Sequence, residues 1–271
     1  MRGLCKKIVQ ITERPLKDGT IINGRFTICR WLGKGSFGFT YIVKEHSSGN
    51  LYVLKQLRKH KMMVPRAYHH SLLQREGNIL KELDHEAFPT IIDEFTYNNK
   101  HFLVMELIHG KTYEEIIFAD EIKFSEIESF KELLKILFHI KYLHDKEYVH
   151  RDLRIPNIIK RENHVFIIDF GLARKISEYD EDLDKASEEK KLFREVSFKS
   201  DFYALGHFLL FLLYSSYEPT SNKKRTWEEE LNISVDGARI IRKLLQIEPP
   251  YEYIDEVIRS VETYIKANEV L

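Results

Sequence analysis

The chain has 271 residues, of which 43% are hydrophobic, and its 42 basic side chains match its 42 acidic ones in number. This size allows two lobes around a buried core, and the balanced charge gives no reason to expect nucleic acid as a partner. Only Cys5 and Cys29 are present, without metal-ligand spacing, which excludes a disulfide framework and favours a reducing compartment. The first residues lack a secretory signal pattern, so we predict a cytoplasmic location.

The beginning of the chain is rich in predicted strands. Residues 26–57 alternate β-prone stretches with turn signals, which predicts an antiparallel three-stranded meander. A helical pattern follows near residues 68–83. Two further strands are predicted at 91–98 and 101–107, around the turn signal of Asn98, Asn99 and Lys100.

After Gly110 the pattern becomes mainly helical. Apolar residues recur at helical spacing at Ile127, Phe130, Leu134, Leu137 and Ile140. Residues 165–169 predict a short buried strand that ends on an acid. Residues 202–214 are apolar but shorter than the roughly 20 residues of a spanning helix, so they predict a buried core helix and no membrane span. Residues 177–191 are polar and acidic, which predicts a mobile loop.

These patterns predict an α+β chain of two lobes. We expect an N-terminal extension over residues 1–24, a first lobe over residues 25–107 and a second lobe over residues 108–271, with both lobes in a single domain over 25–265. The sequence contains no linker rich in Pro, Ser or Gly, so we expect a short hinge between the lobes.

A glycine-rich motif, GKGSFG, lies between two predicted strands and contains Gly33, Gly35 and Gly38. A dinucleotide-binding fingerprint requires a strand followed by a helix, so this context argues against NAD. Glycines allow a hairpin backbone to approach phosphates and present N–H donors to them. Alone, the motif is equally typical of an ordinary glycine-containing turn.

Lys55 lies on the strand after that motif, where its ammonium could reach the phosphates of a nucleotide. Most lysines on strands are simply solvated. Glu76, on the predicted helix beside its apolar face, is the acid best placed to hold Lys55 in position.

The most specific block is HRDLRIPN, which runs from His150 to Asn157. Asp152 could accept the proton of an attacking hydroxyl, and Asn157 could offer an amide oxygen to a hard cation such as Mg²⁺. Asp169, in the sequence DFG, would supply a second oxygen ligand. As isolated residues these acids would be surface groups, but as an ordered set they indicate a site.

Together, GKGSFG, YVLK, Glu76, HRDLRIPN and DFG resemble the motifs of the protein kinase family in order and spacing. The resemblance implies a bilobal protein-kinase-like fold, with a small antiparallel β-rich N-lobe carrying one regulatory helix and a larger, mainly helical C-lobe. It implies ATP and Mg²⁺, with Mn²⁺ as a possible substitute, and a protein substrate whose identity the sequence does not give. In its compact size and its composition rich in Lys, Glu and Ile, the chain resembles a small bacterial serine/threonine kinase.

The resemblance also assigns roles to single positions. The implied catalytic residues are Lys55, Glu76, Asp152, Arg154 and Asn157, and the implied metal ligands are Asn157 and Asp169. The implied nucleotide-binding residues are Leu32, Gly33, Gly35, Ser36, Phe37, Gly38, Thr40, Val53, Lys55, Met105, Glu106, Leu107, Ile108 and Ile159. Among them Met105 resembles the gatekeeper, and Glu106 to Ile108 resemble the hinge that binds adenine. Asp201 would brace the HRD backbone, and Leu80, His150 and Phe170 would belong to a stacked apolar spine.

The chain departs from the family pattern in its substrate-binding region. No APE triplet stands between Asp169 and Asp201, and Glu252 occupies the place of the arginine that normally pairs with its acid. Losing both partners of a buried ion pair can leave stability nearly unchanged. The joint absence of the APE acid and its arginine therefore indicates a shortened variant of the family. Arg154 replaces the lysine usual in serine/threonine kinases, which leaves tyrosine as a possible acceptor, although we favour serine and threonine.

Arg151, beside Asp152, suggests regulation by phosphate on the following loop. The candidate acceptors for autophosphorylation within 177–197 are Ser177, Tyr179, Ser187 and Ser197. The acidic residues of that loop could instead act as a permanent counter-charge. Two other readings of the whole chain stay open: a nucleotide-binding scaffold without catalysis, and a kinase of the same fold that phosphorylates a small molecule.

Overall fold

The computed structural model divides between Ile108 and His109 into two units, each with its own core. The structure describes residues 14–35, 38–57, 66–184, 186–218 and 225–269, apart from the side chains of residues 66–73 and 182.

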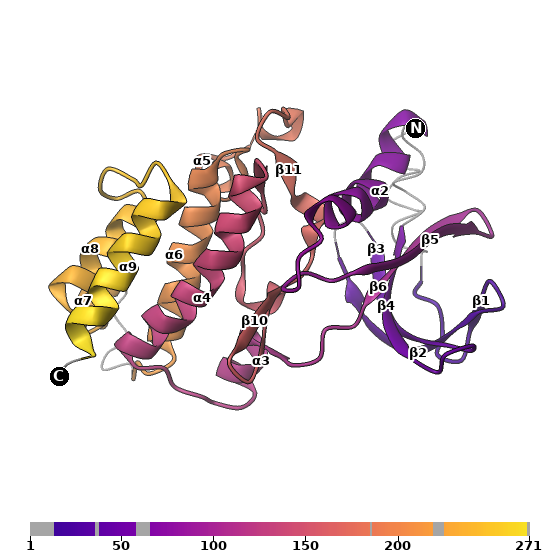
Figure 1. Ribbon diagram of the computed structural model, residues 1–271, viewed down its shortest axis with the longest axis horizontal. Helices are drawn as coiled ribbons and strands as arrows, with labels where there is room; N and C mark the ends of the chain where they lie inside the picture. Colours follow the sequence, from indigo (N-terminus) through magenta and orange to yellow (C-terminus); the bar gives the residue numbers. More distant parts are fainter. Residues whose placement is uncertain (1–13, 36–37, 58–65, 185, 219–224, 270–271) are drawn as a thin grey trace. The chain divides into compact units, whose positions relative to one another are not determined.

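The first unit is built on a six-stranded antiparallel sheet (Figure 1). Its strands are β1 (Ile21–Ile22), β2 (Phe26–Lys34), β3 (Gly38–Glu45), β4 (Leu51–Leu57), β5 (Ile91–Tyr97) and β6 (Lys100–Glu106). Their order across the sheet is β1-β2-β3-β4-β6-β5. The predicted meander is therefore confirmed as β2 to β4, and the two later strands as β5 and β6. The sequence did not predict β1, because two residues are too few to show a period.

The two faces of this sheet carry different side chains. On β3, Phe39, Tyr41 and Val43 are buried in the main apolar cluster of the unit. The alternate residues, which include Thr40, face the other way because successive side chains of a strand point to opposite faces. Helix α2 (Arg66–Leu83) contacts β5 and β6. Its Gly77 comes so near the sheet that a Cβ there would lie 3.2 Å from Leu103 Cδ1.

The second unit is mainly helical, as predicted (Figure 1). Its helices are α3 (Tyr113–Phe118), α4 (Glu126–Asp145), α5 (Glu188–Arg194), α6 (Phe198–Tyr214), α7 (Trp227–Glu230), α8 (Val235–Leu244) and α9 (Ile254–Asn268). Its short strands are β7 (Lys111–Thr112), β8 (Tyr148–Val149), β9 (Ile158–Arg161), β10 (His164–Ile167) and β11 (Arg174–Lys175). Its described residues also form the 3₁₀ turns η2 (Ile155–Asn157), η3 (Phe170–Leu172) and η4 (Glu181–Leu183). Helix α4 packs against α9 and α6, and α6 packs against α8, so α4 and α6 form the centre of this unit.

The buried stripe of α4 differs from the predicted one. Phe130, Leu133, Leu137 and Ile140 are fully buried, whereas Leu134 is only partly buried. Both sets have helical spacing, and only the position of α9 and α6 against the helix selects between them.

Residues 177–191 were predicted to form a mobile loop, but this segment contains the 3₁₀ turn η4 and the start of helix α5. The Ser187 hydroxyl caps α5 by accepting a hydrogen bond from the backbone N–H of Lys190. Acidic residues occupy the first turn and basic residues the last, which suits the helix dipole. The high polarity of the segment therefore reflects a short surface helix.

Helix α6 is confirmed as a core helix, since residues such as Leu205 and Leu209 have no exposed surface. Within the described ranges, no individual helix has the length and apolarity to span a membrane. One sharply bent pair, α5 with α6, meets these criteria by length and composition alone.

Candidate active site

The predicted site residues fall into two halves, one in each unit. In the first unit, Lys55 on β4 and Glu76 on α2 form an ion pair, with 2.6 Å between Nζ and Oε1. Their side chains are only 15% and 3% exposed. Glu76 is thus buried opposite an ammonium, as a buried carboxylate requires. The pair joins a strand and a helix that lie 21 residues apart in sequence.

Several implied nucleotide-binding side chains lie around Lys55 on the same sheet face. Thr40 is opposite Lys55 across β3 and β4, and Val53 is opposite Met105 across β4 and β6. Val53 and Lys55 are two residues apart on one strand, so their side chains point to one face. Met105 is buried, while Leu32 is 45% exposed. This face of the sheet is therefore mostly apolar around the partly buried ammonium of Lys55.

The three glycines of GKGSFG have different surroundings. A Cβ on Gly38 would lie 2.2 Å from the carbonyl oxygen of Gln56, so packing against β4 alone requires glycine there. Among the described residues, nothing lies within 4 Å of a Cβ built on Gly33 or Gly35, which leaves these two positions for a ligand. Ser36 and Phe37, also predicted to bind nucleotide, lie outside the described residues.

The implied hinge, Glu106 to Ile108, follows β6. The Glu106 N–H donates to the Thr90 carbonyl at 2.8 Å, and the Glu106 carboxylate accepts from the Thr90 N–H at 3.2 Å. The Glu106 N–H is therefore already used, and adenine would have to bind other backbone groups of this segment.

In the second unit, Asp201 at the start of α6 fixes the HRD loop. Its carboxylate accepts hydrogen bonds from the backbone N–H groups of His150 and Arg151, at 2.9 and 2.8 Å. His144 adds a contact at 3.0 Å. Burial alone would raise the pKa of Asp201, but the hydrogen bonds from His144 and Arg151 hold it below its usual value. The bracing role implied by the family resemblance is thus seen.

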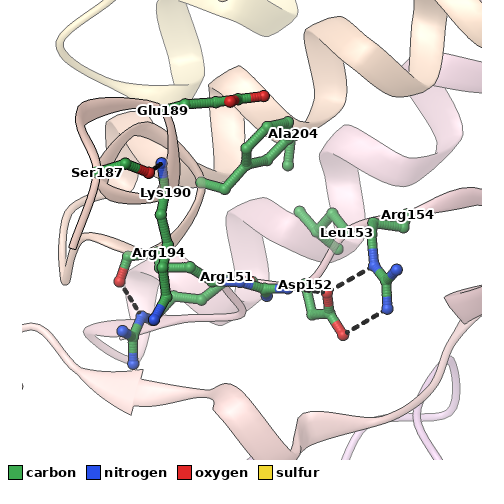
Figure 2. A pocket seen from close by; sticks show the side chains of 10 residues that line it. Arg151, Asp152, Leu153, Arg154, Ser187, Glu189, Lys190, Arg194 and Ala204 are labelled. Carbon is green, nitrogen blue, oxygen red and sulfur yellow. Dashed lines mark hydrogen bonds and ion pairs between the residues drawn. The ribbon is translucent and has the colours of Figure 1, made fainter. Parts of the chain in front are cut away.

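Asp152 is 7% exposed and its carboxylate is fully engaged. Oδ1 accepts from Arg154 Nε at 2.8 Å and pairs with Arg194 Nη2 at 2.8 Å. Oδ2 accepts from Asn157 Nδ2 at 2.9 Å and from Arg154 Nη2 at 3.3 Å. Figure 2 shows the two contacts with Arg154. This buried carboxylate, held by two arginines and an asparagine, is the strongest candidate base in the unit.

Asn157 and Asp169 suit the predicted Mg²⁺ ion. The Asn157 amide nitrogen donates hydrogen bonds to the carbonyl and the carboxylate of Asp152. Its amide oxygen is therefore the atom that can coordinate a metal ion. Asp169 follows β10 and takes a left-handed backbone, with φ of +66°, before η3 begins. Two oxygen ligands match the habit of Mg²⁺, which completes its shell with phosphates and water. Within the described parts of the chain, no three His, Cys, Asp or Glu side chains form a metal-binding group of their own.

Arg151 is 2% exposed and bonded in three directions. Its guanidinium donates to the carbonyls of Arg194 and Leu172 and forms an ion pair with Asp180. The residue that the sequence linked to loop phosphorylation thus already has an acidic partner on that loop.

His150 has no exposed surface, and its ring lies 4.7 Å from that of Phe170. Burial lowers the pKa of His150, so the neutral imidazole is favoured. The His150–Phe170 contact is the part of the implied spine that lies within one unit, while Leu80 belongs to the other.

The implied platform pair is replaced by other contacts. Glu252, which stands where the family has an arginine, forms a surface ion pair with Lys199 at 2.8 Å. Ile159, predicted to bind nucleotide, is 7% exposed on β9, between β10 and β7.

Sequence reasoning missed Arg194 and Lys190, which lie on α5 near Asp152 and line a pocket of about 260 Å³ (Figure 2). No motif marks them, because arginine and lysine are common on surface helices. The signal that could have found them is local: a Ser187 cap followed by acids and then bases indicates a helix.

Comparisons with known proteins agree with this geometry. A family model described as the protein kinase domain matches residues 26–267. The chain is 34% identical over 264 residues to the "Probable serine/threonine-protein kinase YbdM" of Bacillus subtilis, covering 97% of this chain and 98% of the relative. It is 26% identical to serine/threonine-protein kinase B of Synechocystis, covering 86% of this chain and 45% of that protein.

Solved structures show the same fold. The kinase domain of Mycobacterium tuberculosis PknI superposes with a TM-score of 0.65, at 18% identity, over 92% of this chain and 99% of that one. At such identity the likeness concerns the fold, which is the predicted α+β kinase fold. The family match over nearly the whole chain, together with the relative from Bacillus subtilis, shows that the chain belongs to the protein kinase family.

Proposed function

We propose that the protein transfers the γ-phosphoryl group of ATP to serine and threonine hydroxyls of protein substrates. The observation that carries this proposal is the Asp152 carboxylate, held by Arg154 and Asn157 within one short loop. The relatives from Bacillus subtilis and Synechocystis, whose names describe serine/threonine kinases, support the acceptor class.

In the proposed reaction, the acceptor oxygen forms a bond to the γ-phosphorus while the bond from that phosphorus to the β-phosphate oxygen breaks. Asp152 takes the hydroxyl proton, and ADP leaves. Lys55, held by Glu76, neutralises charge on the α and β phosphates, and Arg154 offers a planar guanidinium to the γ-phosphate. Asn157 and Asp169 would hold Mg²⁺, which when bound neutralises phosphate charge. Mn²⁺ offers a similar preference for oxygen ligands.

The first unit supplies the proposed nucleotide surface. Gly33 and Gly35 offer open backbone, Thr40, Val53 and Met105 offer a mostly apolar face, and Lys55 lies among them. A scaffold without catalysis would be expected to lack Lys55, Asp152 or Asp169, and this chain has all three.

We further infer that activity does not depend on phosphorylation of the 177–197 loop. Arg151 already pairs with Asp180, so a permanent carboxylate holds the place where a phosphate would act. Ser187 and Ser197 serve as helix caps, which ties both hydroxyls to local structure. Ser177 and Tyr179 are exposed and remain the candidates for autophosphorylation. A cytoplasmic location stays a prediction from the sequence.

The test is incubation of the purified protein with Mg·ATP and a generic protein substrate, followed by intact mass and site mapping. The unmutated protein should add phosphate to serine or threonine. Asp152→Asn should lower turnover by about 10²- to 10⁴-fold, the usual contribution of a general base, while nucleotide affinity is retained. Near-normal turnover in this variant would refute the role of Asp152. Transfer to small hydroxyl compounds but to no protein would indicate a small-molecule kinase instead.

A further inference from the structure

The pocket beside Asp152 carries an excess of positive charge that the proposed transfer reaction does not use. Its basic lining residues are Arg151, Arg154, Lys190 and Arg194, and its acidic ones are Asp152 and Glu189. Arg151 is neutralised by Asp180 on the loop, and Arg154 is the proposed γ-phosphate ligand. Lys190 and Arg194 are the other two cations, and both come from α5. Arg194 pairs with Asp152.

The position of α5 is fixed by aromatic packing on α6. The Phe193 ring lies 4.7 Å from the ring of Tyr203 and 4.9 Å from that of His207. These contacts hold the last turn of α5 beside the HRD loop, where the Arg194 guanidinium also donates to the Arg151 carbonyl. The fold therefore places the backbone of Arg194 beside the HRD loop, within reach of Asp152.

Arg194 occupies the catalytic carboxylate in this structure. A carboxylate offers about four acceptor sites, and Asp152 fills them with Arg154 twice, Asn157 and Arg194. Accepting a hydroxyl proton requires that one of these contacts be released. Arg154 and Asn157 belong to the same loop as Asp152, whereas Arg194 comes from a separate helix, so Arg194 can withdraw without reshaping the loop.

Lys190 is the second cation that α5 contributes to the pocket. It is exposed and, within the described part of the chain, has no ion-pair partner. In Figure 2, Lys190 lies on the α5 side of the pocket, Asp152 and Arg154 lie on the other side, and the Glu189 carboxylate lies at its far end. The Arg194 guanidinium reaches across to Asp152 Oδ1 at 2.8 Å. An anion beside the acceptor hydroxyl would meet both α5 cations at once.

We propose that Lys190 and Arg194 select protein substrates that carry an anionic side chain, either an acidic or an already phosphorylated residue, close to the acceptor serine or threonine. The anion pairs with the two α5 cations, draws Arg194 away from Asp152 and thereby frees Oδ1 for the hydroxyl proton. This inference rests on the proposed kinase function and names its substrate class.

The test compares four serine peptides that differ at the residues flanking the acceptor: alanine, aspartate, phosphothreonine or lysine. The value of kcat/KM with Mg·ATP should be at least about tenfold higher for the aspartate or phosphothreonine peptide than for the alanine peptide, the effect of one hydrogen bond between charged groups. The lysine peptide should be the poorest. Comparison of the two anionic peptides tells whether carboxylate or phosphate is preferred.

Two variants assign the effect to α5. Arg194→Ala should lower kcat/KM for the anionic peptides but raise kcat for the alanine peptide, because Asp152 Oδ1 is freed; a purely structural role would lower all four together. Lys190→Ala changes an exposed side chain, so it should leave the fold intact and reduce the preference through KM. The matched control is Lys191→Ala, on the same helix but paired with Glu188 and outside the pocket lining, which should keep the preference.

Equal rates for the four peptides would overturn this inference and leave the kinase function intact. So would an Arg194→Ala variant that slows all peptides by the same factor. Failure to phosphorylate any peptide or protein would overturn the proposed function and this inference with it.

Discussion

The two groups of candidate site residues, one in each unit, are each organised in a different way. In the first unit, the Lys55–Glu76 pair joins residues 21 positions apart on a strand and a helix. In the second unit, Asp152 finds Arg154 two residues away and Asn157 five residues away, and Arg194 alone comes from a distant helix. The first half therefore depends on where α2 packs on the sheet, whereas the second is largely organised by its own loop. Long-range pairs are natural points of control, because moving one element breaks them.

The substitution with the largest expected effect is Lys55→Met, which removes the long-range ion pair of the first unit. It should abolish phosphoryl transfer and, because Glu76 is buried, destabilise the protein by about 3–5 kcal/mol. The double variant Lys55→Met/Glu76→Leu should recover most of the stability but none of the activity. The measurements are peptide phosphorylation and denaturant unfolding. Residual activity in Lys55→Met would count against the lysine's role.

The corresponding loss in the second half should be smaller. Arg154→Met leaves Asp152 with Arg194 and Asn157, so the free energy of unfolding should fall by less than about 1 kcal/mol, the usual range for a partly exposed pair. A loss as large as that of Lys55→Met would show that the loop is not locally organised.

Asp180→Asn tests the permanent counter-charge. Removing the carboxylate from buried Arg151 should lower kcat about tenfold, as expected for a hydrogen bond between charged groups. Asp184→Asn, on the same loop but bonded to the exposed Tyr179, is the control and should have little effect. Full activity of Asp180→Asn would refute the idea that this acid orders the loop.

The glycine motif gives a matched pair of substitutions. Gly38→Ala should reduce stability by about 1–3 kcal/mol because its Cβ would overlap the Gln56 carbonyl. Gly33→Ala has open space and should stay within about 0.5 kcal/mol of the unmutated protein in thermal unfolding. Equal losses would mean that the two glycines share one structural role.

The smallest expected effect is on pH dependence. Burial lowers the pKa of His150 and His207 in the folded second unit below the ordinary value of 6.5. The unfolded chain therefore binds more protons just below that pH, so stability should fall as pH drops through about 6.5 and stay flat between about 7 and 8. Thermal unfolding across this range measures it, and His207→Phe should weaken the acid sensitivity. A rise in stability on acidification would contradict the assignment.

The sequence by itself indicated the family, the main strands and the helix of the first unit, the core helix α6 and most candidate residues. Strand meander and core helix follow from side-chain periodicity, and HRDLRIPN places Asp152 and Asn157 on one loop because they are only five residues apart. Both depend on residues that are close together in sequence, so they can be predicted from the sequence alone.

Only the tertiary structure decided the rest. The buried stripe of α4 depends on which helices pack against it, and the need for glycine at position 38 comes from the Gln56 carbonyl on the neighbouring strand. The pairing of Arg194 with Asp152 arises because α5 is packed on α6 through Phe193. Each joins residues far apart in sequence, and no periodicity or motif encodes such distances, because they are set by how the elements fill space.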